Sequence, residues 1–211
     1  VLATPDTLFN LFSASKVVTA MLIHLLDERG LIHLDDPVSE YIPEFSRGSK
    51  RHITIRHILT HRAGIPNNPG HEDPLEVISN RDMILKIICD TEPSLRPGRY
   101  IAYHAITGGF ILAEIIERVT GKDARQFLRS EILNPLGFEN FSYGVPAPLI
   151  PSNVSSTINA DNEQPYDFPC IMKLRFSSGS RSIFIINSIA EYFVLWTVLF
   201  TPSFIGLMKA P

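Results

Sequence analysis

The sequence of 211 residues has little cysteine and no excess of positive charge, and each shortage excludes a class of protein. Its two cysteines, Cys89 and Cys170, lie far apart and lack CxxC or Cys/His ligand spacing, so neither a zinc site nor a disulfide framework is indicated. We expect two buried thiols, with a single disulfide as the alternative. The formal net charge of −3 provides no field that attracts phosphate backbones, so no nucleic-acid partner is expected.

Nucleotide-binding and metalloprotease signatures are also missing, since the chain holds no GxGxxG, GxxxxGK[ST] or HExxH. It begins with Val1 in place of methionine, and its opening VLATPDTLFN lacks the basic and apolar regions of a signal peptide. We therefore expect that the native N-terminus is missing. The sequence assigns neither a compartment nor an oligomeric state.

One apolar stretch, residues 183–200 (IFIINSIAEYFVLWTVLF), just reaches the length of a membrane-spanning helix. It carries Glu191, and a carboxylate near the middle of a span costs about 2.5 to 3.5 kcal/mol on insertion scales. A helix that is buried in the protein or covered by a partner is therefore preferred, and a membrane-associated segment is the alternative.

Hydrophobic periodicity and turn residues predict a chain of helices with few strands. A short extended run followed by a short helix is expected before Gly64, and the residues after about 145 have the composition of loops. Longer helices are expected at 14–29, 75–90, 106–120 and 123–133. Gly30 is expected to cap the end of the helix at 14–29, and Gly121 the end of the helix at 106–120.

The strongest chemical signal is an S-x-x-K motif, formed by Ser13 and Lys16 at the start of the first helix. One helical turn places their Cβ atoms on one face about 5 to 6 Å apart, so the amine reaches the hydroxyl. A serine nucleophile needs an adjacent base, and the apolar residues after Lys16 favour an uncharged amine that serves as one. Backbone amides at the helix N-terminus favour an oxyanion near Ser13. The structural alternative is that Ser13 is an ordinary N-cap, since S-x-x-K arises by chance about once in a chain of this length.

Three segments together resemble the β-lactamase-related serine hydrolases, the superfamily of class C β-lactamases, penicillin-recognising peptidases and similar esterases, including family VIII esterases. The resemblance covers roughly residues 5–145 and is carried by LFSASKVVTAMLIHLLDERGLIHLDDPVSEYIPEF, ITIRHILTHRAGIP and PGRYIAYHAITGGFILAEIIERVTG. It implies an α/β (α+β) fold of the serine β-lactamase/DD-peptidase type, with Ser13 acylated and Lys16 assisting proton transfer. The resemblance implies no metal or organic cofactor.

The second motif of this family, Tyr-x-Asn, matches Tyr103-His104-Ala105. The resemblance makes Tyr103 the general acid or base that moves the serine proton, and a core tyrosine with a satisfied hydroxyl is the alternative. His104 and Ala105 are expected at the substrate-binding face, although the middle position of the motif normally points away. Alanine lacks the amide that asparagine offers to a β-lactam or peptide, so the substitution favours small ester substrates, with weaker β-lactam or amide hydrolysis.

The third motif of the family, Lys-Thr-Gly or His/Trp-x-Gly on an edge strand, has no match in the sequence. That strand supplies half of the oxyanion hole, and loss of one donor costs about 10² to 10³ in rate. We therefore predict a single incomplete domain over residues 1–211, mainly the helical part with an incomplete antiparallel sheet, in which 146–211 diverge from the family. The isolated chain is expected to be a poor enzyme that is unstable, bound to another chain or cut from a longer product. The alternative function is an inactive homologue that serves as a scaffold or assembly module.

Two further clusters are interpreted as structural. His57 and His61 stand four residues apart on an expected helix, but no adjacent glutamate and no third ligand accompany them, so a metal site is not favoured. Asp35 and Asp36 resemble a carboxylate pair, yet the LDDP sequence favours a turn that caps the next short helix.

Overall fold

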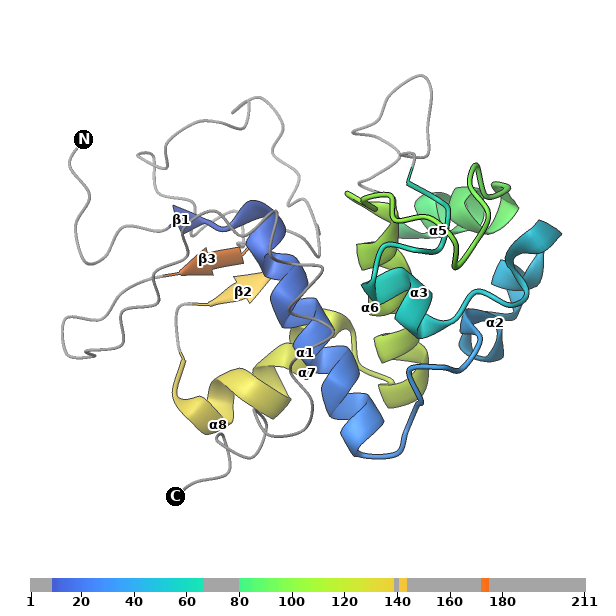
Figure 1. The fold of residues 1–211 in the computed structure, drawn as a ribbon. Helices are drawn as coiled ribbons and strands as arrows, with labels where there is room; N and C mark the ends of the chain where they lie inside the picture. Colours follow the sequence, from blue (N-terminus) through green and yellow to red (C-terminus); the bar gives the residue numbers. More distant parts are fainter. Residues whose placement is uncertain (1–8, 67–79, 139–140, 144–171, 175–211) are drawn as a thin grey trace.

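The computed structural model describes residues 9–66, 80–138, 141–143 and 172–174 (Figure 1). Within these residues, short strands from distant parts of the chain form one antiparallel sheet with the order β1-β3-β2. The strands are β1 (Phe9–Asn10), β2 (Ser142–Tyr143) and β3 (Met172–Leu174). In the register, Lys173 pairs with Asn10 on one side and with Ser142 on the other. The predicted combination of a helical part with a small antiparallel sheet is confirmed.

Helices make up most of the described residues. They are η1 (Phe12–Ala14), α1 (Ser15–Glu28), α2 (Val38–Tyr41), η2 (Pro43–Ser46), η3 (Gly48–Lys50), α3 (Ile55–Leu59), α5 (Arg81–Asp90), α6 (Thr107–Thr120), α7 (Ala124–Leu128), the π-helical turn η4 (Arg129–Leu133) and α8 (Asn134–Leu136). None of the helices in the described part of the chain has the length and apolar character needed to cross a membrane.

Helix α1 ends where the sequence predicts, because Gly30 adopts a left-handed conformation with a φ of +66°. Its N–H donates to the Asp27 carbonyl, and the Leu31 N–H donates to the Leu26 carbonyl, both at 3.0 Å. These two bonds form a Schellman motif, which satisfies carbonyls that the helix leaves without partners. The motif sets the end of the helix that begins beside Ser13.

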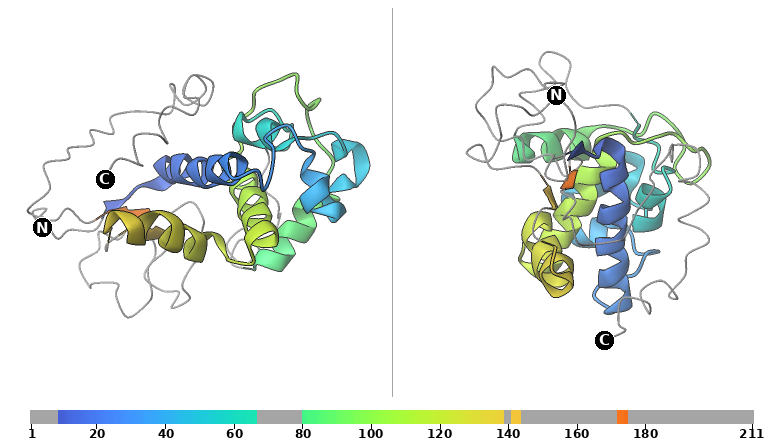
Figure 2. Two further views of the ribbon diagram at one scale, coloured as in Figure 1. Left: turned by 90° about the horizontal axis from the view of Figure 1, so that it is seen from below. Right: turned by 90° about the vertical axis from the view of Figure 1, so that its left-hand side faces the viewer.

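Helix α6 lies at the centre of the helical part (Figure 1). It contacts α1 and α7 on one side and α2, α3 and α5 on the other, an arrangement that Figure 2 shows from two further directions. Apolar side chains on nearly every face of α6 are buried, which explains why it can pack against helices on both sides. Its predicted end is confirmed, since Gly121 is the left-handed C-cap with a φ of +70°.

Two predicted helix boundaries are wrong. Asn80 is extended, and its side chain accepts a hydrogen bond from the Met83 N–H at 3.1 Å, so α5 begins at residue 81 in place of 75. The helix predicted at 123–133 continues through a π-helical turn to Leu136. Residues 75–79 lie outside the described residues.

Cys89 is a buried free thiol on α5, as expected. Cys170 and the apolar stretch 183–200 lie outside the described residues, as does most of 146–211, the region expected to diverge from the family.

Candidate active site

The structure brings Ser13, Lys16 and Tyr103 together. Ser13 lies in the 3-10 turn η1, and Lys16 follows in the first turn of α1. The Lys16 Nζ donates a long hydrogen bond of 3.5 Å to the Ser13 Oγ. From a segment 90 positions away, the Tyr103 hydroxyl donates to the same oxygen at 2.7 Å. The Ser13 hydroxyl therefore accepts from an amine and a phenol, an arrangement suited to moving a proton onto or off the serine.

The three groups are more open to water than the sequence predicts. Ser13 is exposed, Lys16 is half-buried, and Tyr103 keeps 51% of its surface exposed. The expectation of a dry site around Lys16 is therefore wrong for this structure, because the apolar side chains of α1 point mainly toward α6 and α7. The alternative of a core tyrosine is also excluded by this exposure. The Lys16 Nζ lies 5.2 Å from the centroid of the Tyr103 ring, so the cation also interacts with the aromatic face.

Hydrogen bonds between two irregular segments position Tyr103. The segment that follows α3, residues 61–65, runs beside residues 94–107, which lead into α6. Backbone hydrogen bonds join these two segments. The Gly64 carbonyl accepts from the Ser94 and Leu95 N–H groups at 2.9 and 3.2 Å. The Arg62 carbonyl accepts from the Gly98 N–H at 2.8 Å. Buried backbone groups need such partners, so these bonds fix the path of the chain up to Tyr103.

His57 and His61 do not share a helix face, contrary to the expectation. Helix α3 ends at Leu59, and His61 adopts a positive φ of 57° beyond it. The His57 Nδ1 accepts from the Thr54 N–H at 3.2 Å within a capping box of α3. In the described residues no group of three or more His, Cys, Asp or Glu side chains is arranged to hold a metal. The interpretation of both imidazoles as structural agrees with these contacts.

His104 is fully buried, so the expectation that its side chain reaches the substrate-binding face is not met in this structure. Its Nε2 accepts from the Ile65 N–H at 3.2 Å, which turns the ring into the interior. Burial lowers the pKa of His104 to about 4, with a further contribution from His61. The imidazole is therefore neutral at physiological pH. Ala105, the other expected substrate contact, is half-buried.

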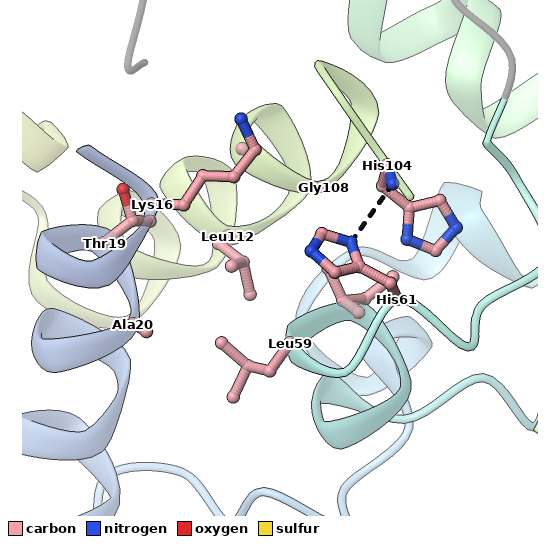
Figure 3. Close-up of a pocket in the computed structure, with 10 residues that line it drawn as sticks. Lys16, Thr19, Ala20, Leu59, His61, His104, Gly108 and Leu112 are labelled. Atoms are coloured by element: carbon pink, nitrogen blue, oxygen red, sulfur yellow. Dashed lines mark hydrogen bonds between the residues drawn. The ribbon is translucent and has the colours of Figure 1, made fainter. Parts of the chain in front are cut away.

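A small cavity of about 30 Å³ lies between α1, α3 and α6, next to Lys16 (Figure 3). Figure 3 shows Lys16 above Leu59 and Leu112, with His61 extending into the same space. The volume suffices for about one water molecule. A larger ligand would therefore reach Ser13 from its exposed side and not through this cavity.

Asp35 and Asp36 make structural contacts, but neither caps α2. Asp35 forms a two-pronged pair with Arg56, with N–O distances of 2.6 and 2.9 Å. Asp36 accepts from the His33 N–H at 2.7 Å and from the Tyr41 hydroxyl at 2.5 Å. The predicted turn is present, and the predicted capping is wrong because Pro37 itself occupies the N-cap position of α2.

Sequence reasoning missed the contact between His61 and Tyr103. Their ring centroids lie 4.9 Å apart with an interplanar angle of 57°. The sequence pattern places His61 on a helix four residues after His57, and this interpretation does not predict a contact with Tyr103. The only signal in the sequence was the place of His61 shortly before Gly64, where a helix ends and backbone direction changes.

The chain is similar to known proteins over most of its length. Residues 1–170 match the family model described as Beta-lactamase. The "Esterase/beta-lactamase LipL" of Mycobacterium tuberculosis (strain ATCC 25618 / H37Rv) is 33% identical over 193 residues, which are 85% of this chain and 42% of the relative.

Solved structures of related proteins also match this chain. A penicillin-binding protein homolog from Caulobacter crescentus matches with a TM-score of 0.64 and 34% identity, over 69% of this chain and 39% of that one. A family VIII carboxylesterase matches with a TM-score of 0.64 and 30% identity, over 68% of this chain and 39% of that one. The chain thus spans between 39% and 42% of the length of these relatives.

Proposed function

Because this chain belongs to the beta-lactamase family, we propose that it acts as a serine hydrolase that forms an acyl-enzyme on Ser13. One observation carries the proposal, namely that the Ser13 Oγ accepts hydrogen bonds from both the Tyr103 hydroxyl at 2.7 Å and the Lys16 Nζ at 3.5 Å. A serine hydroxyl becomes an effective nucleophile only when a neighbouring group can take its proton, and these two groups lie within reach of it. The placement of two proton-carrying groups on the Ser13 oxygen supports catalysis over a purely structural N-cap.

In the proposed reaction, the exposed Tyr103 hydroxyl first releases its proton to water. The phenolate then accepts the Ser13 proton, which reverses the donor and acceptor of the bond in the resting structure. The Lys16 ammonium beside the ring stabilises the phenolate by charge attraction. As the proton leaves, the Ser13 Oγ bonds to the ester carbonyl carbon. The Ser13 N–H then donates to the oxyanion that forms.

The tetrahedral intermediate collapses when the C–O bond to the leaving group breaks. Tyr103 returns its proton to the departing alkoxide, and the acyl group stays on Ser13. A water molecule then gives a proton to Tyr103 and attacks the acyl carbon. Breakdown of this second intermediate releases the acid, and the returning proton restores the Ser13 hydroxyl.

We assign small esters as the preferred substrates. Ala105 occupies the position where the family motif has asparagine, so the chain lacks an amide that would bind the carbonyl and N–H groups of a β-lactam or peptide. A site that lacks such a partner discriminates against substrates that depend on it. Two relatives, an esterase/beta-lactamase and a carboxylesterase, support ester hydrolysis as an activity of this site. Faster hydrolysis of p-nitrophenyl acetate than of a chromogenic cephalosporin is the expected result.

A fluorophosphonate probe tests the proposal, because it phosphonylates an activated serine and releases fluoride. Mass spectrometry should find the label on the peptide that contains Ser13, and Ser13→Ala should abolish it. Ser46→Ala is the matched control, since Ser46 is an exposed serine in another 3-10 turn, and it should label like the wild type. An unlabelled wild-type protein would contradict the proposal and favour the scaffold alternative, which the missing third motif supports.

A further inference from the structure

His61 contacts the chain on both sides of Tyr103. Its backbone carbonyl accepts from the Ala102 N–H at 2.9 Å. Its side-chain Nδ1 accepts from the His104 N–H at 3.1 Å, the bond that is dashed in Figure 3. One residue thus binds the amides immediately before and after the tyrosine. With both neighbouring amides fixed, the backbone at Tyr103 has little freedom to rotate.

The imidazole ring of His61 also contacts the tyrosine side chain directly. The centroid distance of 4.9 Å and the tilt of 57° correspond to a favourable aromatic arrangement. This contact matters because Tyr103 is half exposed and receives little support from the hydrophobic core. Lys16 lies by the same tyrosine ring, so the phenol is bordered by His61 and by the amine.

The conformation of His61 is unusual and serves these contacts. Its φ of 57° lies in the left-handed region, and among the described residues it is the one non-glycine with a positive φ. Burial, with a smaller effect from Lys16, lowers the pKa of His61 to about 4. A neutral ring keeps Nδ1 available as an acceptor for the His104 N–H.

We propose that His61 is a positioning residue, which holds the Tyr103 hydroxyl on Ser13 through the two flanking amides and the ring contact. This inference rests on the proposed function of Ser13 and adds a residue that sequence reasoning interpreted only as structural. His61 does not reach the reacting atoms. It acts through Tyr103, and its loss allows the phenol to leave the serine.

Two variants distinguish the effect of the His61 side chain from the effect of its backbone conformation, because glycine and asparagine both tolerate a positive φ. His61→Gly adopts the left-handed conformation without strain and removes both the acceptor and the ring. His61→Asn also tolerates this conformation, and its Oδ1 replaces Nδ1 as an acceptor for the His104 N–H. His57→Ala is the matched control, because it removes a neighbouring imidazole in α3 whose Nδ1 accepts from the Thr54 N–H and not from an amide that flanks Tyr103.

Two measurements are made on the same proteins. The first is the rate of Ser13 labelling by the fluorophosphonate, which should fall about 100-fold in His61→Gly, since displacement of a catalytic group by about 1 Å can cost that much. In His61→Asn the rate should stay within about tenfold of the wild type, and His57→Ala should label at close to the wild-type rate. The second is hydrogen exchange of the His104 amide, which should accelerate in His61→Gly and remain slow in His61→Asn.

The two readouts distinguish failure of this inference from failure of the proposed function. If the wild type is not labelled, the proposed function fails, and exchange at the His104 amide alone decides whether His61 holds the segment. If the wild type is labelled but His61→Gly is labelled equally fast, the inference is overturned. An equal loss in His57→Ala also overturns it, because the effect would then be general destabilisation. If His61→Gly does not fold, His61→Asn decides, since a rapidly exchanging amide there would refute the role of the acceptor.

Discussion

At the scale of single residues, the proposal depends on one oxygen, the phenolic Oη of Tyr103. Tyr103→Phe removes that oxygen and keeps the ring, so the contact with His61 survives while the bond to Ser13 is lost. General acid and base catalysis contributes about 10² to 10⁴ in rate, and we expect a loss of about that size in p-nitrophenyl acetate hydrolysis. The free energy of unfolding should change by less than about 1 kcal/mol, since the hydroxyl is exposed.

Tyr100→Phe is the matched control for this prediction. Tyr100 is equally exposed, at 50%, and lies three positions away in the same segment. Its phenol should be dispensable, so the rate of ester hydrolysis should match the wild type. A Tyr103→Phe protein that retains the wild-type rate would show that Lys16 alone handles the serine proton.

At the scale of elements, the turn after α3 connects the core to the site, and Gly64 is the position where it is most constrained. Gly64 has a φ of +76°, and a Cβ added there would lie 2.1 Å from the Leu95 carbonyl oxygen. Gly64→Ala must therefore separate the two segments that lead to Tyr103. We expect a loss of more than about 3 kcal/mol in the free energy of unfolding, measured by urea denaturation, because backbone strain and displacement of the hydrogen-bonded Leu95 segment add together.

Gly30→Ala isolates the steric part of this effect. Gly30 has a similar φ of +66°, but a Cβ there meets nothing within 4 Å. Only the conformational strain remains, which costs about 1 kcal/mol. Equal losses of stability in Gly64→Ala and Gly30→Ala would mean that the clash between the added Cβ and the Leu95 carbonyl oxygen costs no stability.

Elements with strong local signals were predictable from the sequence, and those shaped by tertiary contacts were not. The ends of α1 and α6 follow from Gly30 and Gly121, because left-handed caps depend on local geometry. The start of α5 was missed because apolar periodicity continues upstream of Asn80, the residue that caps the helix. Short strands such as β1 carry too little pattern to be recognised before their partners are known.

The residues of the candidate site also divide into those that a local pattern predicts and those that only tertiary contacts bring together. The pairing of Ser13 with Lys16 follows from helical spacing alone. Tyr103 entered only through the family resemblance, since 90 positions separate it from Ser13 and no local rule connects them. The role of His61 required coordinates, because it depends on a positive φ beyond the end of α3.

At the scale of the whole molecule, the described fold brings together the proposed nucleophile and its proposed proton partners but only part of the expected oxyanion site. In the family, the second oxyanion donor comes from the strand that carries the third motif, and that motif is absent from these 211 residues. The chain also spans only 39% to 42% of the length of the three relatives described above. Since one donor contributes about 10² to 10³ in rate, this chain is expected to hydrolyse esters more slowly than the longer relatives do.

Stability of the whole molecule should depend on pH through its buried imidazoles. His61 and His104 have pKa values of about 4 in the folded protein, against 6.5 for an ordinary histidine, mainly because both are buried. Between these two values the unfolded chain binds protons that the folded protein does not, so the free energy of unfolding is constant above pH 6.5 and falls as the pH drops toward 4. Between pH 7 and pH 5 the loss should be about 2 kcal/mol for each imidazole.

Urea denaturation at pH 7 and pH 5 measures this loss of stability. The variant His61→Asn shows how much of the loss is caused by protonation of His61. Protonated His61 cannot accept from the His104 N–H, whereas asparagine keeps that acceptor at every pH. The variant should therefore lose about 2 kcal/mol less than the wild type on acidification. His52→Asn is the matched control, since it removes an exposed imidazole in place of a buried one. If His61→Asn loses as much stability as the wild type, the buried ring does not control the acid sensitivity of the fold.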